Sequence, residues 1–158
     1  MSVAFRRESD DEHKEPEFEL PIPVGPNLVT PRGLRLLGEE VARIEAAVAA
    51  TEAEEERKKL QRRLRYFHTR HATAEVQPAP GDAVVAIGSR VTFTLNGGER
   101  SLTVVGHDEA DPARSHIAFS APLARALMSA EVGETLEYQG REDAIEIVAT
   151  RADPEVQA

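Results

Sequence analysis

The side chains that could do chemistry in this sequence are mainly carboxylates gathered in two short acidic runs. The first run comprises Glu52, Glu54, Glu55 and Glu56, and the second comprises Asp108, Glu109 and Asp111. Carboxylate oxygens grouped in this way can hold a hard divalent cation or contact a basic surface of a partner. Each run can therefore be interpreted as a binding site or as ordinary surface charge, and the neighbouring residues help to decide between these two interpretations.

The first run has basic residues one helical turn away. Glu54 precedes Lys58 by four residues, the order that favours an ion pair on a helix surface. Glu55 stands in the same relation to Lys59. We therefore favour solubilising helix charge over an acidic site. The second run is typical of a polar loop in which an aspartate caps its own turn, and contact with a partner or a cation is the alternative.

Other catalytic and metal-binding patterns are weak. The chain has no Cys, which excludes disulfides, cysteine nucleophiles and cysteine-based metal sites. His68 and His71 have helical spacing, but nearby arginines would repel a cation, so we expect seam or surface histidines. No helix follows Gly97 and Gly98, so they do not form a phosphate-binding loop, and spacing alone supports no Ser-His-Asp triad. We expect no catalytic residue, no metal, no cofactor and no enzymatic activity.

The formal net charge of −9 disfavours nucleic acid as a direct partner. The basic side chains concentrate in one stretch: Arg57, Lys58, Lys59, Arg62, Arg63, Arg65 and Arg70. We favour a salt-bridged, solvated helix face, and the alternative is contact with an acidic protein surface or with nucleic acid held by a partner. No apolar run approaches the ~18 residues of a membrane span, and the N-terminus lacks an apolar signal core. We expect a cytoplasmic protein that binds neither membranes nor specific nucleic-acid sequences.

Two apolar stripes position the first acidic run. One stripe contains Leu34, Leu37, Val41, Ile44 and Val48, and the other contains Leu60, Leu64, Phe67 and His71. Both repeat every three or four residues, the period of helices that pack along a seam. Because the stripes are out of phase, one straight helix would lose its apolar face halfway. We predict an antiparallel helical hairpin that turns near residues 49–53; one long dimerising helix is the alternative.

The boundaries of this hairpin are marked by helix-capping and helix-breaking residues. Thr30 suits the N-cap and Pro31 the first helical position. Residues 1–27 are acidic and rich in Pro, a composition typical of a disordered or extended leader, although Phe5, Phe18 and Leu20 could anchor it. Residues 76–82 contain Pro and Gly and predict a linker.

Beyond residue 83 the pattern changes to short strands. Val91, Phe93 and Leu95 alternate with polar residues, and the turn at residues 96–98 predicts a hairpin to a return strand at 102–105. Further strands are predicted at residues 117–119, 135–138 and 144–149, with a short helix at 122–128. The second unit is thus an α+β module with an antiparallel sheet. We divide the chain into leader 1–27, hairpin 28–75, linker 76–82, sheet domain 83–150 and frayed tail 151–158.

Several spaced motifs resemble the GreA/GreB transcription elongation factors. Residues 102–111 read LTVVGHDEAD, residues 117–127 read IAFSAPLARAL, and residues 132–134 read VGE, as in the C-terminal domain of that family. NLVTPRGL at residues 27–34 is similar to the start of the family's first coiled-coil helix, and RRLRYF at 62–67 to the end of its second. The resemblance covers roughly residues 27–150.

The resemblance implies an antiparallel coiled coil followed by an FKBP-like domain. In the family, the coiled coil enters the secondary channel of RNA polymerase and the FKBP-like domain docks on the channel rim. Acidic residues at the tip help to hold the polymerase magnesium that cleaves backtracked RNA. Transferred to this sequence, the rim-contacting set comprises Asp108, Glu109, Asp111, Ser120, Pro122, Leu123 and Arg125, and the acidic tip comprises Glu52, Glu54, Glu55 and Glu56.

Two departures from the family pattern qualify this transfer. The family's tip motif is replaced by AATEAEEE at residues 49–56, and each predicted helix is shorter than in the family. In the docking loop, Ser120 stands where the family usually has Asp or Asn, and Ala121 stands where it usually has Ser. Pro122 is retained. A prolyl isomerase activity, which FKBP-like folds suggest, is disfavoured because the chain has few aromatic residues to line such a pocket.

We therefore expect a monomeric regulator of transcription elongation that binds RNA polymerase and stimulates transcript cleavage weakly or not at all. The alternative is a protein-interaction adaptor that uses the FKBP-like sheet, with the hairpin as a dimerisation arm. A third possibility is a cleavage factor that reaches into the polymerase with the acidic tip.

Overall fold

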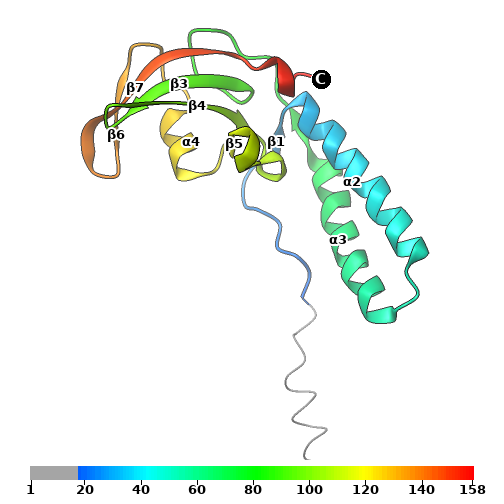
Figure 1. Cartoon of the computed structure of the whole chain (residues 1–158). Coiled ribbons are helices and arrows are strands. Elements are labelled where there is room, and N and C mark those ends of the chain that lie inside the picture. The colour runs from blue at the N-terminus through cyan, green and yellow to red at the C-terminus, as the bar shows by residue number, and fades with distance from the viewer. Residues whose placement is uncertain (1–17) are drawn as a thin grey trace, which may run out of the picture.

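The computed structural model describes residues 18–158 (Figure 1). Most of the predicted leader, residues 1–17 with Phe5, lies outside the described residues. Residues 18–27 form neither helix nor strand. Within them Phe18 and Leu20 are exposed, so neither anchors this segment in a core. Among the described residues, no helix combines the length and apolar character needed to cross a membrane.

Two helices of equal length form the predicted hairpin. Helix α2 (Pro31–Ala50) and helix α3 (Glu54–Thr73) each contain 20 residues and lie side by side, and their connecting turn points away from the sheet (Figure 1). The Thr30 side chain caps α2 by accepting a hydrogen bond from the Gly33 backbone N–H at 3.0 Å. The predicted phase break is confirmed, because the chain turns between the two stripes.

The seam of the hairpin ends differently from the prediction on α3. Leu37, Val41 and Ile44 of α2 are buried. On α3 the stripe continues to the buried Arg70, whereas His71 is exposed. The imidazole of His71 instead lies against Gly38, where an added Cβ would come within 3.4 Å of Nε2. A helix periodicity of 3.6 residues permits either position, and a polar partner, described below, selects Arg70.

A mixed five-stranded sheet forms the second unit. It comprises β3 (Ser89–Leu95), β4 (Gly98–Val105), β5 (His116–Ala118), β6 (Thr135–Tyr138) and β7 (Arg141–Ala152), in the order β5-β4-β3-β7-β6. Helix α4 (Pro122–Leu127) covers one face (Figure 1). The α+β class is confirmed, but β4 and β5 pair in parallel. The acidic loop between them contains the 3-10 turns His107–Glu109 and Pro112–Arg114. It returns the chain along β4, so that β5 can run in the same direction as β4.

The core of the sheet domain is aliphatic around one aromatic ring. Phe93 is fully buried and clusters with residues of β3, β4, β7, α4 and the segment before β3, including Val85, Val91, Val104, Leu127, Ile145 and Ile147. The alternation that predicted β3 is thus the alternation between this core and the opposite face.

A small clasp closes the base of the hairpin. Strand β1 (Leu28–Val29) pairs in parallel with β2 (Glu75–Val76), directly before α2 and directly after α3. The backbone N–H groups of Glu75 and Gln77 donate to the carbonyl groups of Asn27 and Val29. The two ends of the hairpin are therefore held together where they meet the sheet domain.

The tail predicted to fray is structured. Strand β7 continues to Ala152, and a 3-10 turn, η3 (Pro154–Val156), follows it. Asp153 caps this turn by accepting from the Glu155 backbone N–H, and Val156 is fully buried. The Asp-Pro pair was the overlooked signal, because aspartate at an N-cap followed by proline starts a helical turn.

Truncating the aromatic ring at the centre of the core tests this description. We expect Phe93→Ala to lower the free energy of unfolding by about 3–5 kcal/mol, because it removes a fully buried ring and leaves a cavity. Val148→Ala on the neighbouring strand β7 is the control and should change it by no more than about 0.5 kcal/mol, since Val148 is exposed. Urea denaturation followed by circular dichroism measures both; equal losses would contradict the placement of the core.

Candidate functional site

Asp108 connects the sheet domain to the hairpin. Its carboxylate accepts hydrogen bonds from the Tyr66 hydroxyl at 2.6 Å and from Arg70 Nε at 2.7 Å. The side chains of Arg70 and Asp108 are 3% and 12% exposed, so the ion pair is largely screened from water. Asn27 supports it by donating to the Arg70 carbonyl at 2.7 Å. An ion pair of this kind is strongly destabilising to break, because one charge is left buried without a partner.

Glu109 makes a second connection to the start of α2. Its carboxylate accepts from the backbone N–H of Thr30 at 3.1 Å and of Gly106 at 3.0 Å, and it also forms a very short contact with the Thr30 hydroxyl. An added Cβ at Gly33 would lie 2.2 Å from Glu109 Oε2. Gly33 therefore weakens the helix locally but admits the carboxylate. We call the contacts of Asp108 and Glu109 with the hairpin the joint.

Burial and charge at the joint shift the titration of Tyr66. Burial raises the pKa of the phenol to about 12, and its hydrogen bond to the Asp108 carboxylate acts in the same direction. The neutral hydroxyl is the form that can donate to a carboxylate. Because the pKa lies above its ordinary value of 10.0, this contribution to stability is complete below pH 10 and is lost as the pH rises to about 12.

These contacts change the interpretation of two predicted partner-binding residues. Glu109 was predicted to contact a partner, but it is 5% exposed and bonded within the chain, so little of its side chain is available at the surface. The Asp108 side chain is largely buried, and its two oxygens accept hydrogen bonds from Tyr66 and Arg70. The sequence reasoning missed Tyr66 and Arg70 as partners. The available signal was a basic residue at a seam position of α3, which requires a buried acid.

The other predicted partner-binding residues are distributed around α4 and the preceding loop. Ser120, Pro122 and Arg125 are exposed. Leu123 is half-buried and packs against the core of the sheet domain. Asp111 caps the turn Pro112–Arg114 by accepting from the Ala113 N–H at 3.1 Å, as the capping interpretation predicted. The exposed set Ser120, Pro122 and Arg125, called the α4 surface below, is the part available to a partner.

The acidic tip lies at the far end of the hairpin from the sheet (Figure 1). All four predicted tip residues, Glu52, Glu54, Glu55 and Glu56, are exposed. Lys58 lies 3.9 Å from Glu54, whereas Lys59 pairs with Glu56 at 3.7 Å and not with Glu55 as predicted. Exposed pairs of this length contribute little stability. The carboxylates at the tip are thus accessible to solvent.

The basic residues of α3 are largely engaged by acids of the same chain. Arg65 makes two hydrogen bonds to Glu19, at 2.6 and 2.9 Å. Arg63 bonds to Glu40 on α2 at 3.1 Å and lies 5.7 Å from the centre of the Phe67 ring. This pattern favours the predicted solvated, salt-bridged face over a nucleic-acid interface.

Two pockets offer no aromatic-lined site. One, of about 420 Å³, borders the joint and is lined by residues such as Leu37, Phe67 and Asp108. Another, of about 520 Å³, lies beside β4, β5 and α4, where Leu102 and Leu123 line it. Among the residues that line these two pockets, Phe67 is the one Phe, Tyr or Trp.

Comparison with known proteins identifies the sheet domain. The sequence model described as "Transcription elongation factor, GreA/GreB, C-term" matches residues 80–151. Residues 80–151 thus match the C-terminal domain of the GreA/GreB family. The transcription elongation factor GreA of Bacillus cereus ATCC 14579 is 39% identical over 72 residues, which are 43% of this chain and 46% of that protein. GreA of Bacillus licheniformis is 39% identical over 69 residues, 41% and 44% of the two chains. The chain thus spans about half the length of the GreA relatives that it matches.

Two solved structures are also similar to this chain at low identity. GreA factor homolog 1 (Gfh1) of Thermus thermophilus is 17% identical, with a TM-score of 0.37, and the match covers 80% of this chain and 99% of that one. GreA/GreB of Nitrosomonas europaea is 21% identical, with a TM-score of 0.38 and coverage of 80% and 98%.

The joint can be tested by removing one charge. We expect Asp108→Asn to lower the free energy of unfolding by about 3–5 kcal/mol, because Arg70 stays buried without a countercharge. Glu39→Gln removes an acid from the exposed pair with Arg35 and should cost no more than about 1 kcal/mol. Urea denaturation measures both variants. Similar small losses would show that the Asp108 pair is solvated.

The phenol of Tyr66 provides an independent measure of the same contact. In a Tyr138→Phe background, which leaves Tyr66 as the single tyrosine, absorbance titration should give a pKa of about 12. Adding Asp108→Asn should lower this pKa, because the charged acceptor is gone, but not to the ordinary 10.0, because burial remains. Asp111→Asn is the control and should leave it unchanged. An unaltered Tyr66 pKa after Asp108→Asn would refute the hydrogen bond.

Proposed function

We propose that this chain is an RNA polymerase-binding regulator of transcription elongation that docks at the secondary channel and inserts its hairpin. The observation that carries the proposal is a GreA/GreB C-terminal domain joined through two buried acids to a helical hairpin. A hairpin held in this way follows the domain when the domain binds. The α4 surface is the proposed contact with the channel rim, and the cytoplasm is the corresponding location.

The length of the hairpin supports a role in which it enters the channel but does not stimulate transcript cleavage efficiently. Each helix has 20 residues, which gives a length of about 30 Å at ~1.5 Å per residue. The family resemblance implies a longer coiled coil whose tip acids approach the polymerase magnesium. Magnesium requires ligands at ~2.0–2.1 Å, and a tip that stops short cannot supply one. The chain would thus act by occupying the channel, with the polymerase retaining all the chemistry.

The adaptor alternative receives less support from the packing. A dimerisation arm needs an apolar face that its own chain leaves uncovered. Here Leu37, Val41 and Ile44 of α2 are already buried within the described residues, against α3 and the joint. We therefore keep a monomer as the working state. Light scattering of the purified chain separates a monomer from a dimer directly.

Binding to polymerase can be measured with immobilised full-length chain and purified core enzyme. We expect the core subunits to be retained, and Arg125→Glu on the α4 surface to weaken the Kd about tenfold, about 1.4 kcal/mol, by reversing an exposed charge at the contact. Arg141→Glu, also an exposed arginine but at the start of β7, is the matched control and should leave the Kd unchanged. Absence of core subunits would favour the adaptor alternative. Equal effects of the two variants on the Kd would show that the contact does not lie on the α4 surface.

Transcript cleavage in a backtracked elongation complex tests the second part of the proposal. We expect the chain to leave the cleavage rate close to that of polymerase alone, and replacement of Glu52, Glu54, Glu55 and Glu56 by Gln to make no difference. A full-length GreA factor in the same assay is the positive control. Strong cleavage that the Gln replacements abolish would establish the acidic tip as a functional site and overturn this part.

A further inference from the structure

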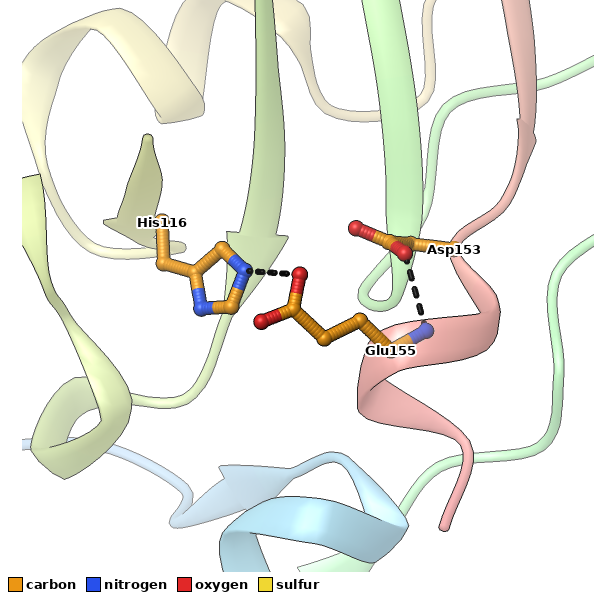
Figure 2. Close-up of side chains that lie close together, drawn as sticks. All are labelled: His116, Asp153 and Glu155. Carbon is orange, nitrogen blue, oxygen red and sulfur yellow. Dashed lines mark hydrogen bonds and ion pairs between the residues drawn. The ribbon is translucent and has the colours of Figure 1, made fainter. Parts of the chain in front are cut away.

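A second group of polar side chains lies beside Thr103 of β4, where β5 begins and the C-terminal tail passes. His116 is the first residue of β5, while Asp153 and Glu155 follow β7 in the structured tail. Figure 2 shows the three side chains converging from these elements. One ligand atom from each of the three lies within 4.8 Å of the others. The tail that brings the two acids to the histidine is the part of the chain predicted to fray.

His116 is buried without a hydrogen-bond partner. Its side chain is 0% exposed, and neither Nδ1 nor Nε2 is bonded among the described residues. Nε2 faces Glu155 Oε2 at 3.8 Å, too far for a hydrogen bond (Figure 2). A buried polar group left without a partner is unfavourable. The ring therefore directs one nitrogen, Nε2, toward Glu155 without bonding to it.

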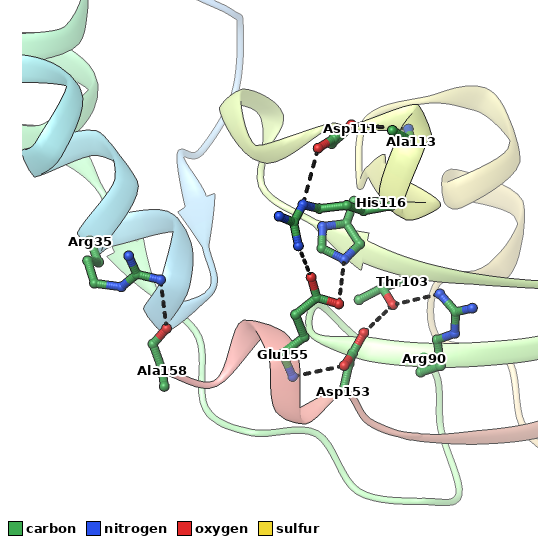
Figure 3. A network of polar contacts seen from close by, with 10 residues as sticks. Arg35, Arg90, Thr103, Asp111, Ala113, His116, Asp153, Glu155 and Ala158 are labelled. Carbon is green, nitrogen blue, oxygen red and sulfur yellow. Dashed lines mark hydrogen bonds and ion pairs between the residues drawn. The ribbon is translucent and has the colours of Figure 1, made fainter.

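The two carboxylates are held by neighbouring groups in positions suited to ligands. Asp153 accepts from the Thr103 hydroxyl at 2.6 Å and from the Glu155 N–H at 2.9 Å (Figure 3). Burial opposes ionisation of Asp153, but these hydrogen bonds and nearby positive charge, including that of Arg90, together hold its pKa below the ordinary value. Arg114 engages Oε1 of Glu155, which leaves Oε2 directed at the imidazole.

We propose that His116, Asp153 and Glu155 bind a divalent transition-metal ion of the Zn²⁺ type. One imidazole nitrogen and two carboxylate oxygens make a three-ligand set in which water completes a tetrahedron. Mg²⁺ prefers ligands that are all oxygen, so the histidine selects zinc over magnesium. Ligand atoms around zinc lie ~3.4 Å apart when the bonds are ~2.1 Å long. The side chains thus need to approach one another by little more than an ångström.

The surroundings supply an outer shell and limit the affinity. Thr103 orients Asp153, and Arg114 orients Glu155, as outer-shell partners orient ligands in known metal sites. Arg114 and Arg90, which reaches toward Thr103, add positive charge near the acids. We therefore expect micromolar binding rather than the tighter binding of a structural zinc finger.

Zinc at this position would fasten the tail to the sheet and, through it, to the hairpin. Asp153 and Glu155 lie in the segment that continues to Ala158, whose carbonyl accepts from Arg35 of α2 at 3.3 Å (Figure 3). Val156, which directly follows Glu155, is fully buried. The ion would therefore stabilise the C-terminal segment against the base of α2.

Calorimetric titration of the chelator-treated full-length chain with ZnCl₂ tests the proposal. We expect one ion per chain, and a raised Tm in its presence because a ligand that binds the folded state stabilises it. His116→Gln and Glu155→Gln should each weaken binding by at least about tenfold. Glu155 is 44% exposed in its side chain, so Glu155→Gln should fold even if the buried His116→Gln does not.

Two controls make the result specific. His68→Gln removes an exposed histidine that lies 3.3 Å from Glu45 on the hairpin, another place within residues 18–158 where a histidine meets an acid closely enough to attract zinc. It should leave binding unchanged, and MgCl₂ should give no heat of binding at the same concentrations. Lack of zinc binding, or binding that survives Glu155→Gln or disappears in His68→Gln, would overturn the proposed site.

Discussion

The arrangement of this protein depends on the burial of two consecutive acids, Asp108 and Glu109, between its two units. Asp108 neutralises the buried guanidinium of Arg70, and Glu109 accepts from the backbone at the start of α2. Both acids sit in a short 3-10 turn at the end of β4, so the sheet presents them to the hairpin in a fixed direction. Because an unpaired buried charge is unfavourable, the hairpin cannot leave this position without exposing or stranding these groups.

This constraint connects the fold to the proposed activity. A regulator that acts by placing a helical finger in a channel needs the finger to follow the domain that docks. The joint supplies that coupling, and the parallel clasp between β1 and β2 adds a second connection at the base of the hairpin. The α4 surface belongs to the sheet domain, whereas the exposed acidic tip lies at the far end of the hairpin (Figure 1). The proposed contact with the channel rim is therefore separate from the tip.

Sequence reasoning recovered the features that depend on local pattern. The out-of-phase stripes identified the hairpin, Thr30 its N-cap, and the alternation of Val91 and Phe93 a strand of the sheet. It failed where distant residues decide the outcome. The charge of Glu109 suggests a surface, yet Gly33, far away in sequence, opens the space that buries it. Arg70 replaces His71 in the seam because Asp108 lies opposite, and no helical period contains that information. The tail is ordered because Val156 finds the core and Asp153 caps a turn.

The most direct measurement is a cryo-electron microscopy structure of the chain bound to core polymerase, in which the distance from the turn at residues 51–53 to the catalytic magnesium is read. The account predicts the hairpin inside the secondary channel, the Asp108–Arg70 contact intact, and the carboxylates of the turn beyond coordination distance. A domain bound with its hairpin outside the channel would contradict it, as would a tip glutamate ligating the magnesium.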